Sequence, residues 1–190
     1  MARKGLNSAA TLLQLAAVPN TVEIPAFIRL KPEDVTVPLA YHQIGRALLA
    51  QGKSEEALAA FRESLARDPR DQGSLAGVAD TLAALDRLSD AVTAYQQYLR
   101  AYPNSPVAMM NLGLTLVKLD RDAEARELFA RVVQMKPDDV GAHVNLAYAL
   151  ANTGRYGDSV KEFRRAAELE EDPAIRAEIE AAISQLLGAH

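Results

Sequence analysis

The sequence predicts an all-α solenoid built from repeated helix pairs, and three observations lead to this fold class. Residues 106–139 match the sequence 34 residues before and after them, position by position. Within each such repeat the apolar residues recur at intervals of three and four, which is the period of an amphipathic helix. One repeat buries too little apolar surface alone, so neighbouring repeats must stack into a continuous core.

Composition restricts both the class of protein and its chemistry. The 190 residues are 49% hydrophobic and 24% charged, as in a soluble globular chain. Lys and Arg number 21 against 25 Asp and Glu, and the net charge of -4 provides no general attraction toward nucleic acid. The absence of cysteine excludes disulfides, thiolate metal sites and thiol nucleophiles.

Residues 1–37 fall outside the repeat and form an N-terminal extension. Its apolar run, Ala9–Val18, predicts a short helix over residues 8–17; a secretory signal is the alternative, but Gln14 interrupts the run. Prolines between residues 19 and 38 favour an extended chain thereafter. We expect the apolar residues of this stretch to cover the open face of the first repeat, the alternative being contact with another protein. They are Ile24, Phe27, Ile28 and Leu30.

Columns of equivalent residues step by 34 through the helix pairs. A small column in the first helices lets the two helices of a pair approach closely, and an aromatic column in the second helices fills the gap beyond it. Pro69, Pro103 and Pro137 end second helices, because proline cannot continue the hydrogen-bond ladder. The small column is Gly45, Ala79, Gly113 and Ala147; the apolar columns are Ile44, Val78, Leu112, Leu146 and Leu48, Leu82, Leu116, Leu150; the aromatic column is Phe61, Tyr95, Phe129 and Phe163.

Polar residues mark the helix starts and the turns. Asp71, Ser105 and Asp139 precede first helices, and each side chain is expected to accept a hydrogen bond from an otherwise unpaired backbone amide. In the turn inside each pair, glycine or aspartate occupies the position where a left-handed backbone is least costly. These turn residues are Gly52, Asp86, Asp120 and Gly154.

The columns resemble those of the tetratricopeptide repeat family across four repeats. The resemblance implies a right-handed α-α superhelix of four helix pairs. Ser64, Tyr98 and Val132 depart from it, since they replace the family's usual small residue late in the second helix, and Glu171 stands where the fourth proline is expected. The repeats are residues 38–71, 72–105, 106–139 and 140–171.

Residues 172–190 are expected to form a C-terminal capping helix. Asp172 and Pro173 are typical of a helix start, and the helix is predicted over residues 173–187. Its apolar stripe would close the last repeat, while its polar face stays in solvent. The acidic residues of this tail fit a solvated cap; an acidic dock for a basic partner is the alternative. The predicted stripe is Ile175, Ile179, Ile183 and Leu186.

The family resemblance also implies a concave groove lined by the first helices. This groove is mostly apolar, which suits an amphipathic helix or an extended peptide. Asn111 and Asn145 match the asparagine ladder that pairs with peptide backbone in O-linked N-acetylglucosamine transferase, with a local role as the alternative. The carboxylate clamp of chaperone-cofactor members is absent. The expected groove residues are His42, Gln43, Arg46, Asp80, Met110, Asn111, Leu114, Lys118, Val144, Asn145 and Tyr148.

No motif points to catalysis, to a metal or to a cofactor. The sequence has no phosphate-binding glycine loop, nucleophile elbow or two-histidine zinc helix, and we expect no enzyme activity. His143 takes the position that Tyr41, Leu75 and Met109 hold elsewhere, so it is expected to be a packing residue.

The predicted function is a protein–protein interaction scaffold or adaptor, a subunit of a larger assembly that binds a helix or extended peptide. An assembly or secretion chaperone that shields an apolar segment is the alternative. RNA binding is a third possibility, but Arg46, Lys118 and Tyr148 are too few for a basic, stacking-rich groove, so we expect no nucleic acid partner. No apolar run is long enough to span a bilayer, and the expected location is the cytoplasm unless the N-terminus acts as an export signal.

Overall fold

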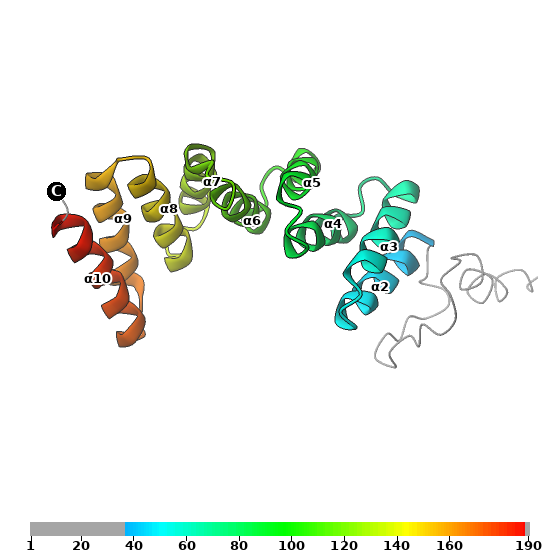
Figure 1. Cartoon of the computed structure of the whole chain (residues 1–190), viewed down its shortest axis with the longest axis horizontal. Helices are drawn as coiled ribbons and strands as arrows, with labels where there is room; N and C mark the ends of the chain where they lie inside the picture. Colours follow the sequence, from blue (N-terminus) through cyan, green and yellow to red (C-terminus); the bar gives the residue numbers. More distant parts are fainter. Residues whose placement is uncertain (1–36, 189–190) are drawn as a thin grey trace, which may run out of the picture. The chain divides into compact units, whose positions relative to one another are not determined.

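The computed structural model describes residues 37–188, and every regular element within them is a helix (Figure 1). The all-α fold class is therefore confirmed. The predicted helix over residues 8–17 and the apolar residues Ile24, Phe27, Ile28 and Leu30 lie outside the described residues. The helices are α2 (Val37–Ala50), α3 (Ser54–Arg67), α4 (Gln72–Ala84), α5 (Leu88–Ala101), α6 (Pro106–Val117), α7 (Asp122–Met135), α8 (Val140–Asn152), α9 (Tyr156–Leu169) and α10 (Pro173–Gly188).

The described chain divides inside α4 into two compact units. The N-terminal unit ends at Thr81 and the C-terminal unit begins at Leu82. In the first unit α2 packs against α3, and in the second the helices from α5 to α10 each pack against the next. The predicted helix pairs are confirmed in this arrangement, because each pair is joined by a short turn and packs through its apolar side.

The turns inside the four pairs have the predicted left-handed residues. The backbone angle φ is 75° at Gly52, 57° at Asp86, 56° at Asp120 and 77° at Gly154. Glycine adopts this conformation without a Cβ clash, and aspartate tolerates it better than most residues. In every turn the next backbone N–H then donates to a leucine carbonyl five residues earlier. These bonds are Lys53 to Leu48 and Arg87 to Leu82, both 2.9 Å, and Arg121 to Leu116, 2.9 Å, and Arg155 to Leu150, 2.8 Å.

The predicted helix caps are also present. The amide of Ser74 donates to Asp71 Oδ2 at 2.7 Å, and the amide of Ala142 donates to Asp139 Oδ1 at 2.9 Å. Ser105 accepts from the amide of Ala108 at 3.3 Å. The second helices α3, α5 and α7 end two residues before the prolines of the predicted column. These local signals position each first helix, which carries the expected binding residues.

The core of the N-terminal unit is centred on Phe61, whose side chain is almost completely buried. A Cβ at Gly45 would lie 2.6 Å from this ring, and a Cβ at Gly77 would lie 2.7 Å from it. The ring therefore requires glycine on both sides, whereas the sequence register predicted only Gly45. Ser64, a departure from the family pattern, is fully buried and donates to the carbonyl of Pro38 at 2.8 Å.

The C-terminal unit repeats this packing and is closed by α10. Phe129 lies where a Cβ of Gly113 would clash with its ring. Phe163 and Ala147 share a buried cluster with Ile179, the only residue of the predicted α10 stripe that is fully buried in the described chain. Ile183 and Leu186 pack partly against the same cluster. Ile175 departs from the prediction, since it is 45% exposed in the first turn of α10, where Arg176 instead donates to the carbonyl of Glu170.

Candidate functional site

The candidate binding surface of the C-terminal unit lies on one side of α6 and α8. Residues spaced by three and four along each helix share this side. The thioether of Met110 on α6 accepts a hydrogen bond from Asn145 Nδ2 on α8 at 3.3 Å, which shows that the two rows are adjacent. We call this surface the α6–α8 face. Its residues are Val107, Met110, Asn111, Leu114 and Lys118 from α6 and its C-terminal cap, and Val144, Asn145 and Tyr148 from α8.

The α6–α8 face exposes large apolar side chains to solvent. Val107 is 65% exposed, Leu114 is 41% exposed and Tyr148 is 53% exposed. Single exposed apolar residues are ordinary on protein surfaces, but a group of them on one face marks a place that another molecule covers. The sequence register predicted this face correctly as mostly apolar.

Asn145 has a local role within the free chain. Its Nδ2 donates to the carbonyl of Gly141 at 2.8 Å as well as to Met110, so both amide protons are in use. Its Oδ1 accepts no hydrogen bond from the described residues and is available to a ligand N–H. Asn111 is half-buried, and its backbone carbonyl accepts from Thr115 Oγ1 at 2.7 Å.

Tyr148 is held in one orientation by the core beneath it. Its ring meets the ring of Phe163 edge to face, with centroids 5.0 Å apart and an interplanar angle of 89°. Such contacts contribute about 0.5–1.5 kcal/mol beyond burial. A half-exposed aromatic ring with a defined orientation is a suitable anchor for a partner, because little side-chain entropy remains to be lost on binding.

The predicted groove residues of the N-terminal unit have different surroundings. The His42 side chain is only 15% exposed, and its Nδ1 lies 3.3 Å from Ser74 Oγ and 3.6 Å from Asp71 Oδ2. Burial lowers the pKa of His42, with Asp71 raising it and Arg46 lowering it further. A Cβ at Gly73 would overlap the imidazole, so this glycine makes room for it. His42 therefore joins α2 to the start of α4, while Arg46 and Asp80 are exposed and Gln43 is half-buried.

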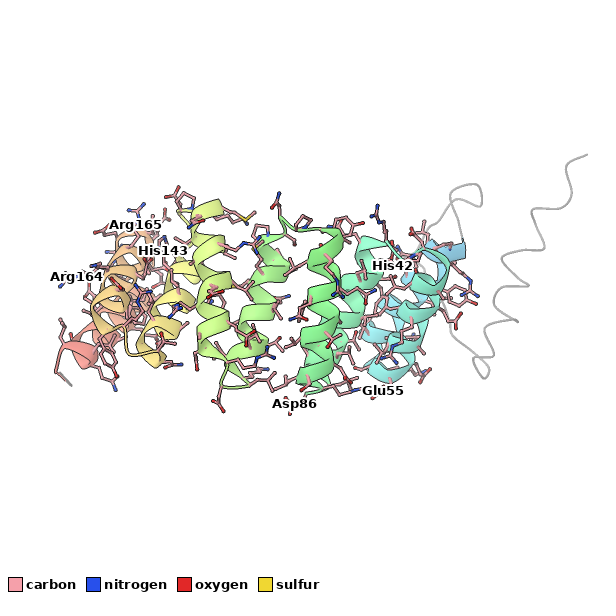
Figure 2. All side chains as sticks on the ribbon, turned by 90° about the horizontal axis from the view of Figure 1, so that it is seen from above. His42, Glu55, Asp86, His143, Arg164 and Arg165 are labelled. Carbon is pink, nitrogen blue, oxygen red and sulfur yellow. The ribbon has the colours of Figure 1, made fainter. Side chains whose placement is uncertain are left out.

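His143 is buried in α8, as its column predicted (Figure 2). Its Nδ1 lies 2.7 Å from Glu162 Oε2 on α9, and its Nε2 lies 3.0 Å from the carbonyl of Pro137. The sequence analysis missed Glu162. One signal could have found it, because Glu162 stands 34 residues after the apolar Leu128 and a carboxylate in an apolar column needs a polar partner.

Two further observations apply to residues 37–188 alone. No group of three or more His, Cys, Asp or Glu side chains in this range is arranged to hold a metal ion. No helix in it is both long enough and apolar enough to cross a membrane.

Comparison with known proteins agrees with this geometry. MamA from Desulfovibrio magneticus RS-1 has a similar structure, with a TM-score of 0.68 and 22% identity over 80% of this chain and 96% of that one. YrrB, described as a TPR protein with an unusual peptide-binding site, has a TM-score of 0.67 and 22% identity over 73% of this chain and 72% of that one. Curated protein sequences give no match.

The model of the tetratricopeptide repeat matches two stretches of the sequence, residues 42–106 and residues 108–174. Together these stretches make up more than half of the 190 residues. They also contain the turns, caps and core columns described above. The chain therefore belongs to the tetratricopeptide repeat family.

Proposed function

We propose that the chain is a non-enzymatic scaffold or adaptor that holds a helix or extended segment of a partner protein on the α6–α8 face. The observation that carries this proposal is the group of exposed apolar residues Val107, Leu114 and Tyr148 on two adjacent helices. Covering such a surface removes apolar area from water, which favours association by about 25 cal/mol for each Å² buried.

The polar residues of the face define which partner chemistry fits. Asn145 Oδ1 can accept a backbone N–H from the partner, which orients a peptide along the face. Lys118 is exposed at the C-terminal end of α6 and favours an acidic residue at that end of the segment. An apolar segment with one acidic flank therefore fits the face best.

The family supports the same function at a general level. The fold is that of a protein-interaction module, and the printed description of YrrB, a structural neighbour, includes a peptide-binding site. We infer from this fold that the expected ligand is a protein or peptide. The particular residues of the α6–α8 face are our own assignment from exposure and hydrogen bonding.

A matched pair of substitutions tests the assignment. Leu114 and Met135 are each 41% exposed, but only Leu114 belongs to the α6–α8 face. After native co-purification and mass spectrometry identify a partner, we expect Leu114→Glu to weaken its binding at least about tenfold. Met135→Glu should leave binding unchanged, and both variants should keep the melting temperature of the original chain.

The same experiment separates the scaffold from the chaperone. A partner that stays at equal stoichiometry in the mature assembly supports the scaffold, whereas one that is bound only before assembly supports the chaperone. Full binding by Leu114→Glu would show that the partner uses another surface of the chain.

A further inference from the structure

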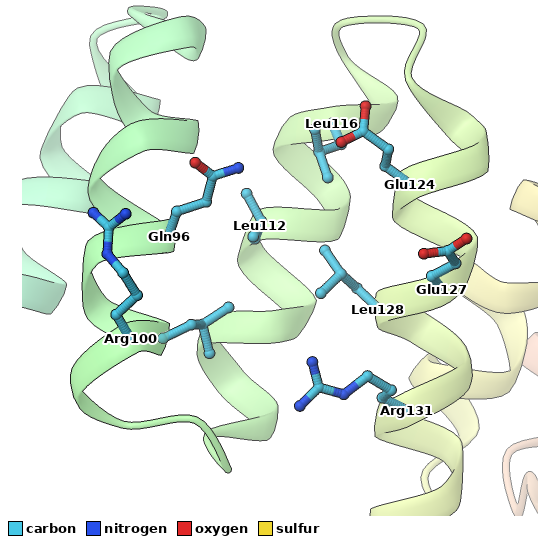
Figure 3. Close-up of a pocket in the computed structure, with 9 residues that line it drawn as sticks. Gln96, Arg100, Leu112, Leu116, Glu124, Glu127, Leu128 and Arg131 are labelled. Atoms are coloured by element: carbon cyan, nitrogen blue, oxygen red, sulfur yellow. The ribbon is translucent and has the colours of Figure 1, made fainter.

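A second recessed surface lies between α5 and α7, with α6 as its floor (Figure 3). It has a volume of about 440 Å³, within the range of roughly 300–1,000 Å³ that is usual for ligand pockets. Leu112 and Leu116 form the floor, and Leu99 and Leu128 form the apolar walls. We call it the α5–α7 cleft.

This cleft is separate from the α6–α8 face. Leu112 and Leu114 are two residues apart on α6, which places them about 200° apart around the helix axis. Leu114 is exposed on the α6–α8 face, whereas Leu112 is buried beneath the cleft. One helix therefore contributes to two surfaces on its opposite sides.

The rim of the cleft is charged with opposite signs at its two ends. Figure 3 shows Arg100 and Arg131 facing each other at one end and Glu124 beside Leu116 at the other. Glu124 is already neutralised, since Arg121 binds it through two hydrogen bonds of 2.7 and 2.8 Å and holds the pKa of this carboxyl below its usual value. The remaining carboxylate of the rim is Glu127.

Three rim charges are available to a ligand. Arg100 and Glu127 take part in no ion pair among the described residues. Arg131 donates one hydrogen bond, from Nη2 to the carbonyl of Pro103 at 3.3 Å, and its other N–H groups remain free for an acceptor. The cleft thus presents two cations at one end, an apolar middle and an anion toward the other end.

The next repeat shows that the fold does not require this pattern. At the positions 34 residues later, Arg100 is replaced by Gln134, Glu127 by Lys161 and Leu128 by Glu162. The helices α7, α8 and α9 pack in the same order with these residues. The leucine walls and the separated charges are therefore properties of one place in the chain.

We infer that the α5–α7 cleft binds a segment of a second protein, one with aliphatic side chains between an acidic residue and a basic residue. The aliphatic groups would contact the four leucines, the acidic residue would pair with Arg100 and Arg131, and the basic residue would pair with Glu127. This charge arrangement sets the orientation of the segment. The chain would then hold one partner on each side of α6, which goes beyond the single binding face proposed above.

Two synthetic helical peptides test this inference by fluorescence anisotropy. Each has two adjacent leucines with a lysine one turn to one side and a glutamate one turn to the other, in opposite orders, with alanine elsewhere. We expect one order to bind at least about tenfold more tightly than a version whose glutamate is replaced by lysine. Arg100→Glu should weaken that binding by about tenfold.

Two variants of the same chain serve as controls. Gln134→Glu places the same charge at the equivalent exposed position of the next repeat, and Leu114→Glu changes the α6–α8 face. Neither should alter peptide binding, and circular dichroism should show that all variants keep their helices. The inference is wrong if neither peptide order binds, if Arg100→Glu binds as tightly as the original chain, or if either control variant weakens binding as much as Arg100→Glu.

Discussion

The third and fourth repeats have the same helix plan but differ in one part of their interior. In the third, Met109 is fully buried, and Leu128 packs against the same apolar cluster. In the fourth, the equivalent residues are His143 and Glu162, which form a contact of 2.7 Å. A single buried imidazole or carboxylate without a partner is costly, so a change at one position requires a change at the other.

This difference shows what the repeat period determines. The period places each pair of residues next to one another, but it allows the pair to be apolar or polar. The aromatic ring and small residue beneath it are less variable, since Phe129 and Phe163 are both buried to the same degree. The predictions that follow test this distinction, from the largest expected effect to the smallest.

The aromatic column should contribute equally to both repeats. Phe129→Ala and Phe163→Ala should each lower the free energy of unfolding by about 3–5 kcal/mol, because each leaves a cavity in the core. Urea denaturation followed by circular dichroism measures both losses. A loss at Phe163 far smaller than at Phe129 would show that the two cores are not equivalent.

The small column should be strict in the third repeat. Gly113→Leu should lower the free energy of unfolding by about 1–3 kcal/mol or more, because even a Cβ at this position meets the ring of Phe129. Leu119→Met, which changes a half-buried residue at almost constant volume, provides the control. An unchanged urea midpoint for Gly113→Leu would refute the packing register.

The polar pair of the fourth repeat should be energetically coupled. In a double-mutant cycle of His143→Ala and Glu162→Ala, the two losses should exceed the loss of the double variant by about 1 kcal/mol, as expected for a partly solvated charged hydrogen bond. Met109→Ala and Leu128→Ala, studied in the same way, give the apolar comparison. Additive losses at His143 and Glu162 would mean that the contact does not stabilise the fold.

The smallest effect concerns the pH dependence at His42, which has a hydroxyl partner where His143 has a carboxylate. Because burial lowers the pKa of His42 in the folded chain, the unfolded chain binds its proton more readily. Stability should therefore fall as the pH drops through about 6.5, the ordinary value for histidine, toward the lower folded pKa.

His42→Gln should remove this contribution from the pH profile of the melting temperature. His190→Gln, which lies outside the described residues, is the control. A profile that keeps the same slope between pH 7 and pH 5 in His42→Gln would show that His42 does not cause it.

The sequence predicted the features that depend on neighbours along the chain. Caps such as Asp139, turns such as Gly154 and helix ends before prolines were all correct, because each is decided within a few residues. The exposed apolar rows on α6 and α8 were predicted because they follow from the same period.

The missed features join residues from different helices. Glu162 looks like an ordinary exposed helix residue until α8 places His143 beside it. Gly77 resembles a gap in the groove row until the ring of Phe61 is seen against it. The α5–α7 cleft was missed for the same reason, since its walls come from three helices and no single stretch of sequence contains them.

The four identical turns inside the helix pairs restrict how the chain can change in length. Each turn combines one left-handed residue with the same hydrogen bond to a leucine carbonyl. Inserting or deleting 34 residues reproduces this turn, whereas a change of one residue would shift a side chain such as Leu85 or Arg87 into the left-handed position, at a cost of roughly 1–2 kcal/mol. The protein can therefore lengthen or shorten by whole helix pairs far more readily than by single residues.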